Sequence, residues 1–260
     1  MIVRKEADGT LLLIAQTDHS RLVGVIGSHW GNERFAAPRP YESVARAATF
    51  HDFGWLRYET APIWDAESGE TPGFRQIPGS AAQLEAYEWC YDWLLKDDPY
   101  AGLIVNMHRT GLWRGRYDAI NHPPHPIRPL APAVEAFAAE AEARQAEERK
   151  SFDAQELWTN YRLLQVWDLL GLYFSCQDPF DEYVEPVPTG YDGGKSDGVR
   201  MTLKPVTSRK VAFDPYPFDR RPCPVQLGCK RLPKIRYPDR EAFRRAYFQA
   251  PTELIQFELV

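Results

Sequence analysis

The chain has 260 residues, of which 44% are hydrophobic and 26% are charged, and its formal net charge is −5 at pH 7. This composition is typical of a globular protein that folds in water, and no apolar run approaches the roughly 18 residues that a membrane span needs. Residues 1–9 carry charges where a signal peptide has an apolar stretch, so we expect a cytoplasmic protein. Its four cysteines include no C-x-x-C pair and are expected to be reduced thiols.

Basic residues concentrate near the end of the chain, where residues 195–260 contain 14 Lys and Arg but 7 Asp and Glu. They are scattered among prolines and short apolar runs, and they form no cluster of the kind that follows a phosphate backbone. We therefore expect this segment to pack on a more acidic neighbour, and we do not expect nucleic acid as a partner.

The first 80 residues predict a hairpin and two helices. Two apolar runs on either side of a turn make residues 1–14 a β-hairpin. A helix follows, with Thr17 or Asp18 as its N-cap and an end near Trp30. A second helix, over residues 41–53, ends in the dipeptide His51-Asp52. The Pro- and Gly-rich connection over residues 54–80 is long enough to suggest a lid.

The rest of the chain predicts further helices and then strands. Helical patterns cover residues 81–95, 100–110, 131–150 and 155–176. Short β-branched and aromatic runs predict strands at residues 199–205, 210–213, 225–229 and 253–259, with one helix over residues 239–248. The fold class is therefore α+β: a helical core over residues 16–180 and a small antiparallel sheet from residues 195–260, against which the hairpin of residues 1–15 packs and which it can join.

Asp168 is the most informative residue of the apolar helix. Its neighbours leave almost no polar face: Leu164, Trp167, Leu169, Leu170 and Leu172. A carboxylate in such surroundings is strongly destabilised unless a cation neutralises it. Two kinds of partner are open, a divalent ion shared with His51 and Asp52, or a buried ion pair with an arginine such as Arg21, Arg46 or Arg109. The metal hypothesis fails if Asp168 lies far from His51 or pairs with a guanidinium instead.

Helix phase identifies His19 as a further candidate ligand. At about 100° per residue, the face of His19 is also the apolar face of its helix, formed by Leu22, Val23, Ile26 and Trp30. His29 lies off this face and about 15 Å farther along the axis, too far to share one ion. The alternatives are a core histidine held by a hydrogen bond for His19, and an imidazolium at a helix C-terminus for His51.

Several polar residues in the middle of the chain can serve a substrate. His108 follows a buried segment and either stabilises charge or caps its helix. Arg109, Arg114 and Arg116 suit phosphate or carboxylate recognition, although surface arginines are usually only solvated. Two further histidines lack Cys or acidic companions and are expected to be loop residues: His122 and His125.

The order of His19, His51-Asp52, His108 and Val166-Trp167-Asp168 resembles the H…HD…H…D pattern of the HD-domain superfamily over roughly residues 16–177. Nearly the whole chain is more narrowly similar to an uncharacterised bacterial family, domain of unknown function 3891. The segments that carry this similarity are Gln16-Thr17-Asp18-His19-Ser20, His51-Asp52-Phe53-Gly54-Trp55 and the series Pro62, Asp65, Gly69, Pro72 and Phe74.

The superfamily resemblance implies an all-helical core in which His19, His51, Asp52 and Asp168 hold one divalent ion (Mn, Fe, Zn, Ni or Mg). It implies a phosphohydrolase or phosphodiesterase acting on a phosphorylated small molecule or nucleotide. Catalytic roles then fall to His108 and Asp52, and substrate contacts to Arg109, Trp55, Arg114 and Arg116.

The chain departs from the superfamily pattern at two points. Trp55 stands where Lys or His often follows H-D-x-G, and His108 is single where two-metal relatives have a pair, so one ion is expected. No G-Y-P sequence follows His108, which argues against a cyclic-dinucleotide phosphodiesterase. The alternatives are an HD-type iron-dependent oxygenase and a non-catalytic metal- or ligand-binding protein. The oligomeric state is left open.

Overall fold

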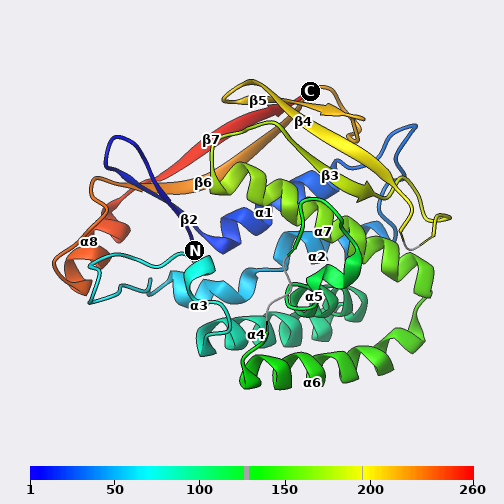
Figure 1. The fold of residues 1–260 in the computed structure, drawn as a ribbon, viewed down its shortest axis with the longest axis horizontal. Helices are drawn as coiled ribbons and strands as arrows, with labels where there is room; N and C mark the ends of the chain where they lie inside the picture. Colours follow the sequence, from blue (N-terminus) through cyan, green and yellow to red (C-terminus); the bar gives the residue numbers. More distant parts are fainter. Residues whose placement is uncertain (126–128, 195) are drawn as a thin grey trace.

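A sheet and a group of helices form two layers in the computed structural model, which describes residues 1–125, 129–194 and 196–260 (Figure 1). The helices are α1 (Gln16–Ser28), α2 (Tyr41–Phe50), α3 (Leu56–Glu59), α4 (Ala81–Asp97), α5 (Pro99–Gly111), α6 (Pro132–Glu148), α7 (Ala154–Cys176) and α8 (Arg240–Gln249). The strands are β1 (Ile2–Lys5), β2 (Leu11–Ile14), β3 (Glu182–Val187), β4 (Val199–Thr207), β5 (Lys210–Asp214), β6 (Cys223–Leu232) and β7 (Thr252–Leu259). The α+β prediction is confirmed.

The strands of the described residues form one seven-stranded sheet in the order β1-β2-β6-β7-β5-β4-β3. The N-terminal hairpin belongs to this sheet, because β2 pairs with β6 and Leu12 lies opposite Arg231. The expectation of a purely antiparallel sheet is wrong at one place: β5 and β7 run parallel, with Val211 opposite Leu259. The chain makes β6 and α8 between these two strands, and that crossover allows the parallel pairing.

Helices and sheet share a hydrophobic core, because alternate residues of each strand face the helices. Val225 and Leu227 of β6 belong to the same buried cluster as Trp167 of α7. The ring of Phe174 packs on Phe257 of β7, with 4.8 Å between ring centroids. On the other face of β2, Leu11 and Leu13 pack against Phe243 and Tyr247 of α8. The sheet therefore fixes the two helices that lie directly beneath it, α1 and α7.

Several helix ends differ from the prediction by a few residues, and two of them border the candidate site. Helix α1 begins two or three residues earlier than expected, with Ala15 at its N-cap instead of Thr17 or Asp18. The distant carboxylate of Glu59 accepts hydrogen bonds from the backbone N–H groups of Gln16 and Thr17, so a local side-chain cap is unnecessary. Helix α2 ends at Phe50 rather than at residue 53, and the chain then turns through His51 and Asp52.

Strand β3 was not predicted, because Pro186 lies within it and proline is uncommon inside strands. The other four predicted strands are present with slightly longer bounds. No helix among the described residues is long and apolar enough to cross a bilayer.

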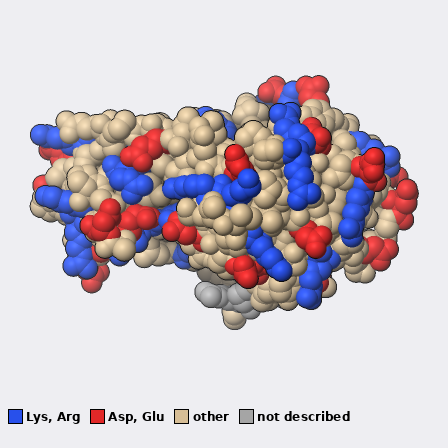
Figure 2. Space-filling view, turned by 90° about the horizontal axis from the view of Figure 1, so that it is seen from above, with Lys and Arg blue, Asp and Glu red and all other residues tan. Residues whose placement is uncertain are grey.

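The basic residues of the C-terminal segment are mixed with carboxylates on the surface. Figure 2 shows Lys and Arg side chains interspersed with Asp and Glu on the face seen from above. Several pair directly, as Arg200 does with Glu185 at 2.7 Å and Arg236 with Glu70 at 2.9 Å. This surface carries charges of both signs rather than one continuous cationic stripe.

Candidate metal centre

Helix α1 presents His19 to the interior, as its phase predicted. His19 is fully buried, and Leu22, Val23 and Ile26 on the same face belong to the core. The neighbouring helix α7 comes very close at Gly171, where a Cβ would lie 2.7 Å from His19 Cε1. His29 lies at the other end of α1 and contacts Asp219 at 3.1 Å. The glycine in α7 therefore provides the space that the His19 ring occupies.

The end of helix α2 fixes the orientation of His51. Its Nδ1 lies 2.9 Å from the Ala48 carbonyl and 3.1 Å from Ser20 Oγ. The carbonyl can only accept, and the Ser20 hydroxyl donates its hydrogen to the Thr49 carbonyl. Nδ1 must therefore carry a hydrogen. In the neutral ring the lone pair is then on Nε2.

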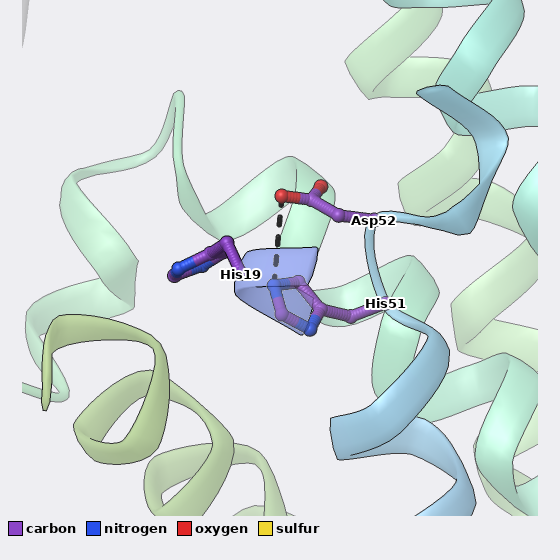
Figure 3. Close-up of side chains that lie close together, drawn as sticks. All are labelled: His19, His51 and Asp52. Carbon is purple, nitrogen blue, oxygen red and sulfur yellow. Dashed lines mark ion pairs between the residues drawn. The ribbon is translucent and has the colours of Figure 1, made fainter. Parts of the chain in front are cut away.

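The lone pair of the neutral His51 ring faces two carboxylates, of which Figure 3 shows Asp52. Its Nε2 lies 3.6 Å from Asp52 Oδ2 and 3.8 Å from Asp168 Oδ1. These separations are too long for hydrogen bonds, and this buried nitrogen has no hydrogen-bond partner in the described residues. Three acceptors that face each other in a buried space repel one another unless a cation or proton lies between them. The donor set therefore fits a divalent cation that prefers nitrogen and oxygen ligands.

Asp168 lies near the middle of helix α7 and uses its two oxygens differently. Oδ1 faces the histidines, at 3.1 Å from His19 Nε2, whereas Oδ2 accepts from Arg116 Nη2 at 3.2 Å. Of the two kinds of partner foreseen for this carboxylate, a guanidinium is present; it binds one oxygen and leaves the other directed at His51. The arginine itself was not foreseen as the partner. Arg21 pairs with Asp18, Arg46 with Glu42 and Arg109 with Glu88.

Burial affects the two carboxylates in opposite directions. Burial raises the pKa of Asp52, and the nearby His51 and His19 offset this only in part. Burial also acts to raise the pKa of Asp168, but the hydrogen bond with His19 and the charge of Arg116 outweigh it, and its pKa lies well below the usual value. The ionised form of Asp168 is therefore favoured. The positive charge near Asp52 is too small to offset the effect of burial on its pKa.

Helix α5 brings His108 to the same cluster. The centroid of its ring is 5.0 Å from that of His51, and Gln165 Nε2 lies 2.7 Å from its Nδ1. Burial lowers the pKa of His108 well below its ordinary value, so the ring is neutral at pH 7. Two groups of donor atoms lie within 4.8 Å of one another: His19, His51 and Asp52, and His51, His108 and Asp168. All five metal and catalytic candidates of the sequence thus come together.

The residues expected to contact substrate lie in four different settings. Trp55 is buried in an aromatic group with Tyr58 and Tyr87. Arg109 is buried and donates to the Tyr87 carbonyl and to Glu88. Arg114 binds two carboxylates of α6, Glu135 at 2.7 Å and Glu142 at 3.0 Å. Arg116 binds the carboxylate of Asp168 through its side chain, whereas Trp55 reaches Asp52 through a backbone hydrogen bond. A substrate role for any of the four remains a prediction.

Three polar residues that support the cluster were missed from the sequence. Gln16 Nε2 donates to Asp52 Oδ2 at 3.2 Å, Ser20 accepts the Asp52 backbone N–H, and Gln165 contacts His108. Gln165 could have been found, because a buried glutamine three residues before Asp168 lies on the same face of an apolar helix. His122 pairs with Glu182 at 2.7 Å, an acidic companion that the sequence reasoning did not foresee, and it forms an isolated β-bridge with Glu185.

Comparison with known proteins agrees with the narrower similarity seen in the sequence. The profile of the family described as "Protein of unknown function (DUF3891)" matches residues 1–234. No curated protein and no solved structure matches the chain. The matched region contains every candidate ligand and the strands up to β6. The chain therefore belongs to the DUF3891 family.

Proposed function

We propose that this protein is a metal-dependent hydrolase of the phosphohydrolase or phosphodiesterase type, built on an HD-like helical core and acting on a phosphorylated small molecule or nucleotide. The observation that carries this proposal is the buried lone pair of His51, which faces oxygens of Asp52 and Asp168 at 3.6 and 3.8 Å. A cation resolves this repulsion. His19 would supply a further nitrogen once its hydrogen moves from Nε2, which contacts Asp168, to Nδ1, which faces the Ser175 hydroxyl.

The residues divide the work between holding the ion and acting on substrate. His19, His51, Asp52 and Asp168 would hold a divalent ion (Mn, Fe, Zn, Ni or Mg). When bound, such an ion supplies positive charge that polarises a phosphoryl oxygen and makes water a better nucleophile. Arg116 holds the second oxygen of Asp168, which keeps the first directed at the histidines. In this proposal His108 stabilises charge on the transferred group, and Asp52 accepts a proton.

A non-catalytic metal-binding protein is the second candidate, and burial is the observation that favours it. His19, His51 and Asp168 are each no more than 4% exposed, and Asp52 is 8% exposed. A catalytic ion needs an open coordination position for its substrate, whereas a structural ion is closed off by protein ligands. The hydrolase therefore requires movement near the cluster, and residues 54–80 are the segment that we propose moves.

Elemental analysis of purified protein tests the metal site. We expect about one equivalent of a divalent metal in the wild type and almost none in Asp52→Ala or Asp168→Ala. Asp214→Ala, an exposed carboxylate at the end of β5, is the matched control and should keep the metal. Unchanged metal content in both site variants would refute the proposal, provided that circular dichroism shows the variants to be folded.

Activity then separates the two functions. A hydrolase should release nitrophenol or phosphate from nitrophenyl phosphates and nucleotides after metal is added, and chelation should abolish the release. Stoichiometric metal without release from any of these phosphoesters would favour the binding protein. Oxygen uptake by the iron-loaded protein, in place of phosphoester cleavage, would assign it to the oxygenases instead.

A further inference from the structure

The role of His108 in the cluster is left open by distance alone. One of its ring nitrogens lies within 4.8 Å of donor atoms of His51 and Asp168. That spacing would allow His108 to be a third imidazole ligand of the proposed ion, and equally a hydrogen-bonding group beside it. The hydrogen bonds around the ring decide between these roles.

Arg116 fixes the orientation of the Gln165 side chain. A guanidinium has donors only, so the Gln165 atom that faces Arg116 Nη1 must be the amide oxygen. The amide nitrogen is then the atom 2.7 Å from His108 Nδ1. Arg116 also binds Asp168, which lies one helical turn after Gln165 on α7. One buried guanidinium therefore sets both side chains of α7 that face the cluster.

The amide nitrogen of Gln165 is a donor, so His108 Nδ1 must accept. An accepting Nδ1 keeps its lone pair for this hydrogen bond, and the hydrogen of the neutral ring is on Nε2. Neither nitrogen then has a lone pair free for a metal ion. His51 has the opposite arrangement, because its Nδ1 donates to the Ala48 carbonyl and leaves Nε2 free.

We propose that Arg116 and Gln165 are positioning residues that hold His108 as an Nε2–H hydrogen-bond donor for an anionic phosphoryl oxygen, and that His108 is not a metal ligand. The part about the phosphoryl oxygen rests on the proposed function, whereas the form of the ring does not. Together the two neighbouring histidines give the site one lone pair for a cation and one N–H for an anion. The substrate class that this pairing suits is a phosphate ester whose oxygen approaches the ion.

Nitrogen NMR of ¹⁵N-histidine-labelled, metal-free protein tests the ring form directly. Two-bond correlations distinguish the two neutral tautomers, and loss of signals in His108→Gln assigns the residue. We expect the Nε2–H form for His108 and the Nδ1–H form for His51. An Nδ1–H form for His108 would overturn the inference, whether or not the protein binds metal or cleaves phosphoesters.

Gln165→Glu should reverse the form of the ring, because a carboxylate can accept from Nδ1–H while still accepting from Arg116. Gln145→Glu is the matched control, since Gln145 is equally buried and donates to Asn106 and Thr110 rather than to His108. We expect the control to keep the Nε2–H form. An Nε2–H form that persists in Gln165→Glu would also overturn the inference.

Cobalt(II) substitution tests whether His108 is a metal ligand. The wild-type visible spectrum should stay unchanged in His108→Gln, because His108 is not a ligand, whereas Gln165→Glu should change it by adding an imidazole. If phosphoesters are cleaved, Gln165→Glu should lower kcat by about 10²-fold, the usual effect of losing one donor to a developing charge. A spectrum altered in His108→Gln would show a ligand and contradict the inference. Failure to bind cobalt refutes the proposed function but not the form of the ring.

Discussion

Helix α5 places two adjacent residues in two buried polar regions of different character. His108 enters the cluster with His51 and Asp168, whereas Arg109 turns about 100° away and enters a network between α4 and α6. In that network the two oxygens of Glu88 bind guanidinium groups, Arg144 at 2.6 Å and Arg109 at 3.0 Å. Two guanidinium groups share one carboxylate there, so donors are in surplus: Arg109 Nη2 and Arg144 Nε are buried without a hydrogen-bond partner among the described residues, and both guanidinium groups lie over the Tyr91 ring.

The cluster on the other side of α5 has the opposite imbalance, a surplus of acceptors. Arg116 satisfies one oxygen of Asp168, but Asp52 receives only a neutral hydrogen bond from Gln16 and faces the lone pair of His51. A buried surplus of donors offers nothing to a metal ion, whereas a surplus of acceptors is relieved by a cation or a proton. Burial of polar groups alone does not identify a metal site; a surplus of acceptors does.

The largest effect is expected from Asp168→Asn, which removes the charge partner of Arg116. A buried guanidinium without its carboxylate typically lowers the free energy of unfolding by about 3 kcal/mol. Denaturant unfolding of the metal-free protein at pH 7 measures this loss, and elemental analysis should show that metal is also lost. A variant as stable as the wild type would mean that Arg116 does not depend on Asp168.

Arg109→Met should destabilise the network without affecting the cluster. The variant loses hydrogen bonds to Glu88, Tyr87 and Asn106 but keeps most of the side-chain volume, so we expect about 2 kcal/mol less stability. Metal content should remain that of the wild type. Loss of metal from a folded Arg109→Met protein would instead show that the two regions are coupled, and it would contradict their description as separate regions.

Gly171→Ala should act on the cluster by displacing His19. The added Cβ would meet His19 Cε1 at 2.7 Å, and we expect metal affinity to fall about tenfold, as when a ligand loses its support. Gly190→Ala is the control, because a Cβ there meets nothing within 4 Å. Isothermal titration with the metal found in the wild type compares the two variants, and equal affinities would contradict the geometry.

Asp52→Asn should stabilise the metal-free protein, whereas most substitutions of buried residues destabilise a protein. Burial raises the pKa of Asp52, so the folded state binds its proton more tightly than the unfolded state does. The metal-free wild type therefore loses stability as pH rises above the ordinary value of 3.8, and the variant does not. Thermal melts should show a higher Tm for the metal-free variant at pH 7, a difference that vanishes below pH 3.8. With metal present the order should reverse; a variant less stable at every pH would refute this.

Arg114→Gln should have the smallest effect on stability. Its partner Glu135 is largely solvent-exposed, and exposed pairs contribute about 1 kcal/mol or less. This variant also tests the expected substrate role. An unchanged KM for a cleaved phosphoester would mean that Arg114 only pairs with the carboxylates of α6. A raised KM would mean that the substrate binds near Arg114.

Helices and strands whose apolar residues repeat with a clear period were predictable from sequence. Contacts made by residues in turns were not. The phase of α1 identified His19 as inward, and the apolar neighbours of Asp168 showed that it needs a partner. The identity of that partner depends on a turn in which Arg116 and Tyr117 both have positive φ, at 55° and 50°. Arg and Tyr carry no sequence signal for this conformation, which usually favours Gly or Asn. The cap of α1 by Glu59 was hidden for a similar reason, since the two are far apart in sequence.

The pairing of β2 with β6 joins segments about 220 residues apart, and it determines when α1 can reach its final packed position. Helix α1 contacts α2, α7 and β6, and the last two are synthesised long after it. His19 is thus made early but reaches its final position only after the ribosome has delivered the strand that ends at Leu232. Loading of an ion should accordingly be a late event in the maturation of the chain, and truncation before β6 should yield a protein unable to retain metal.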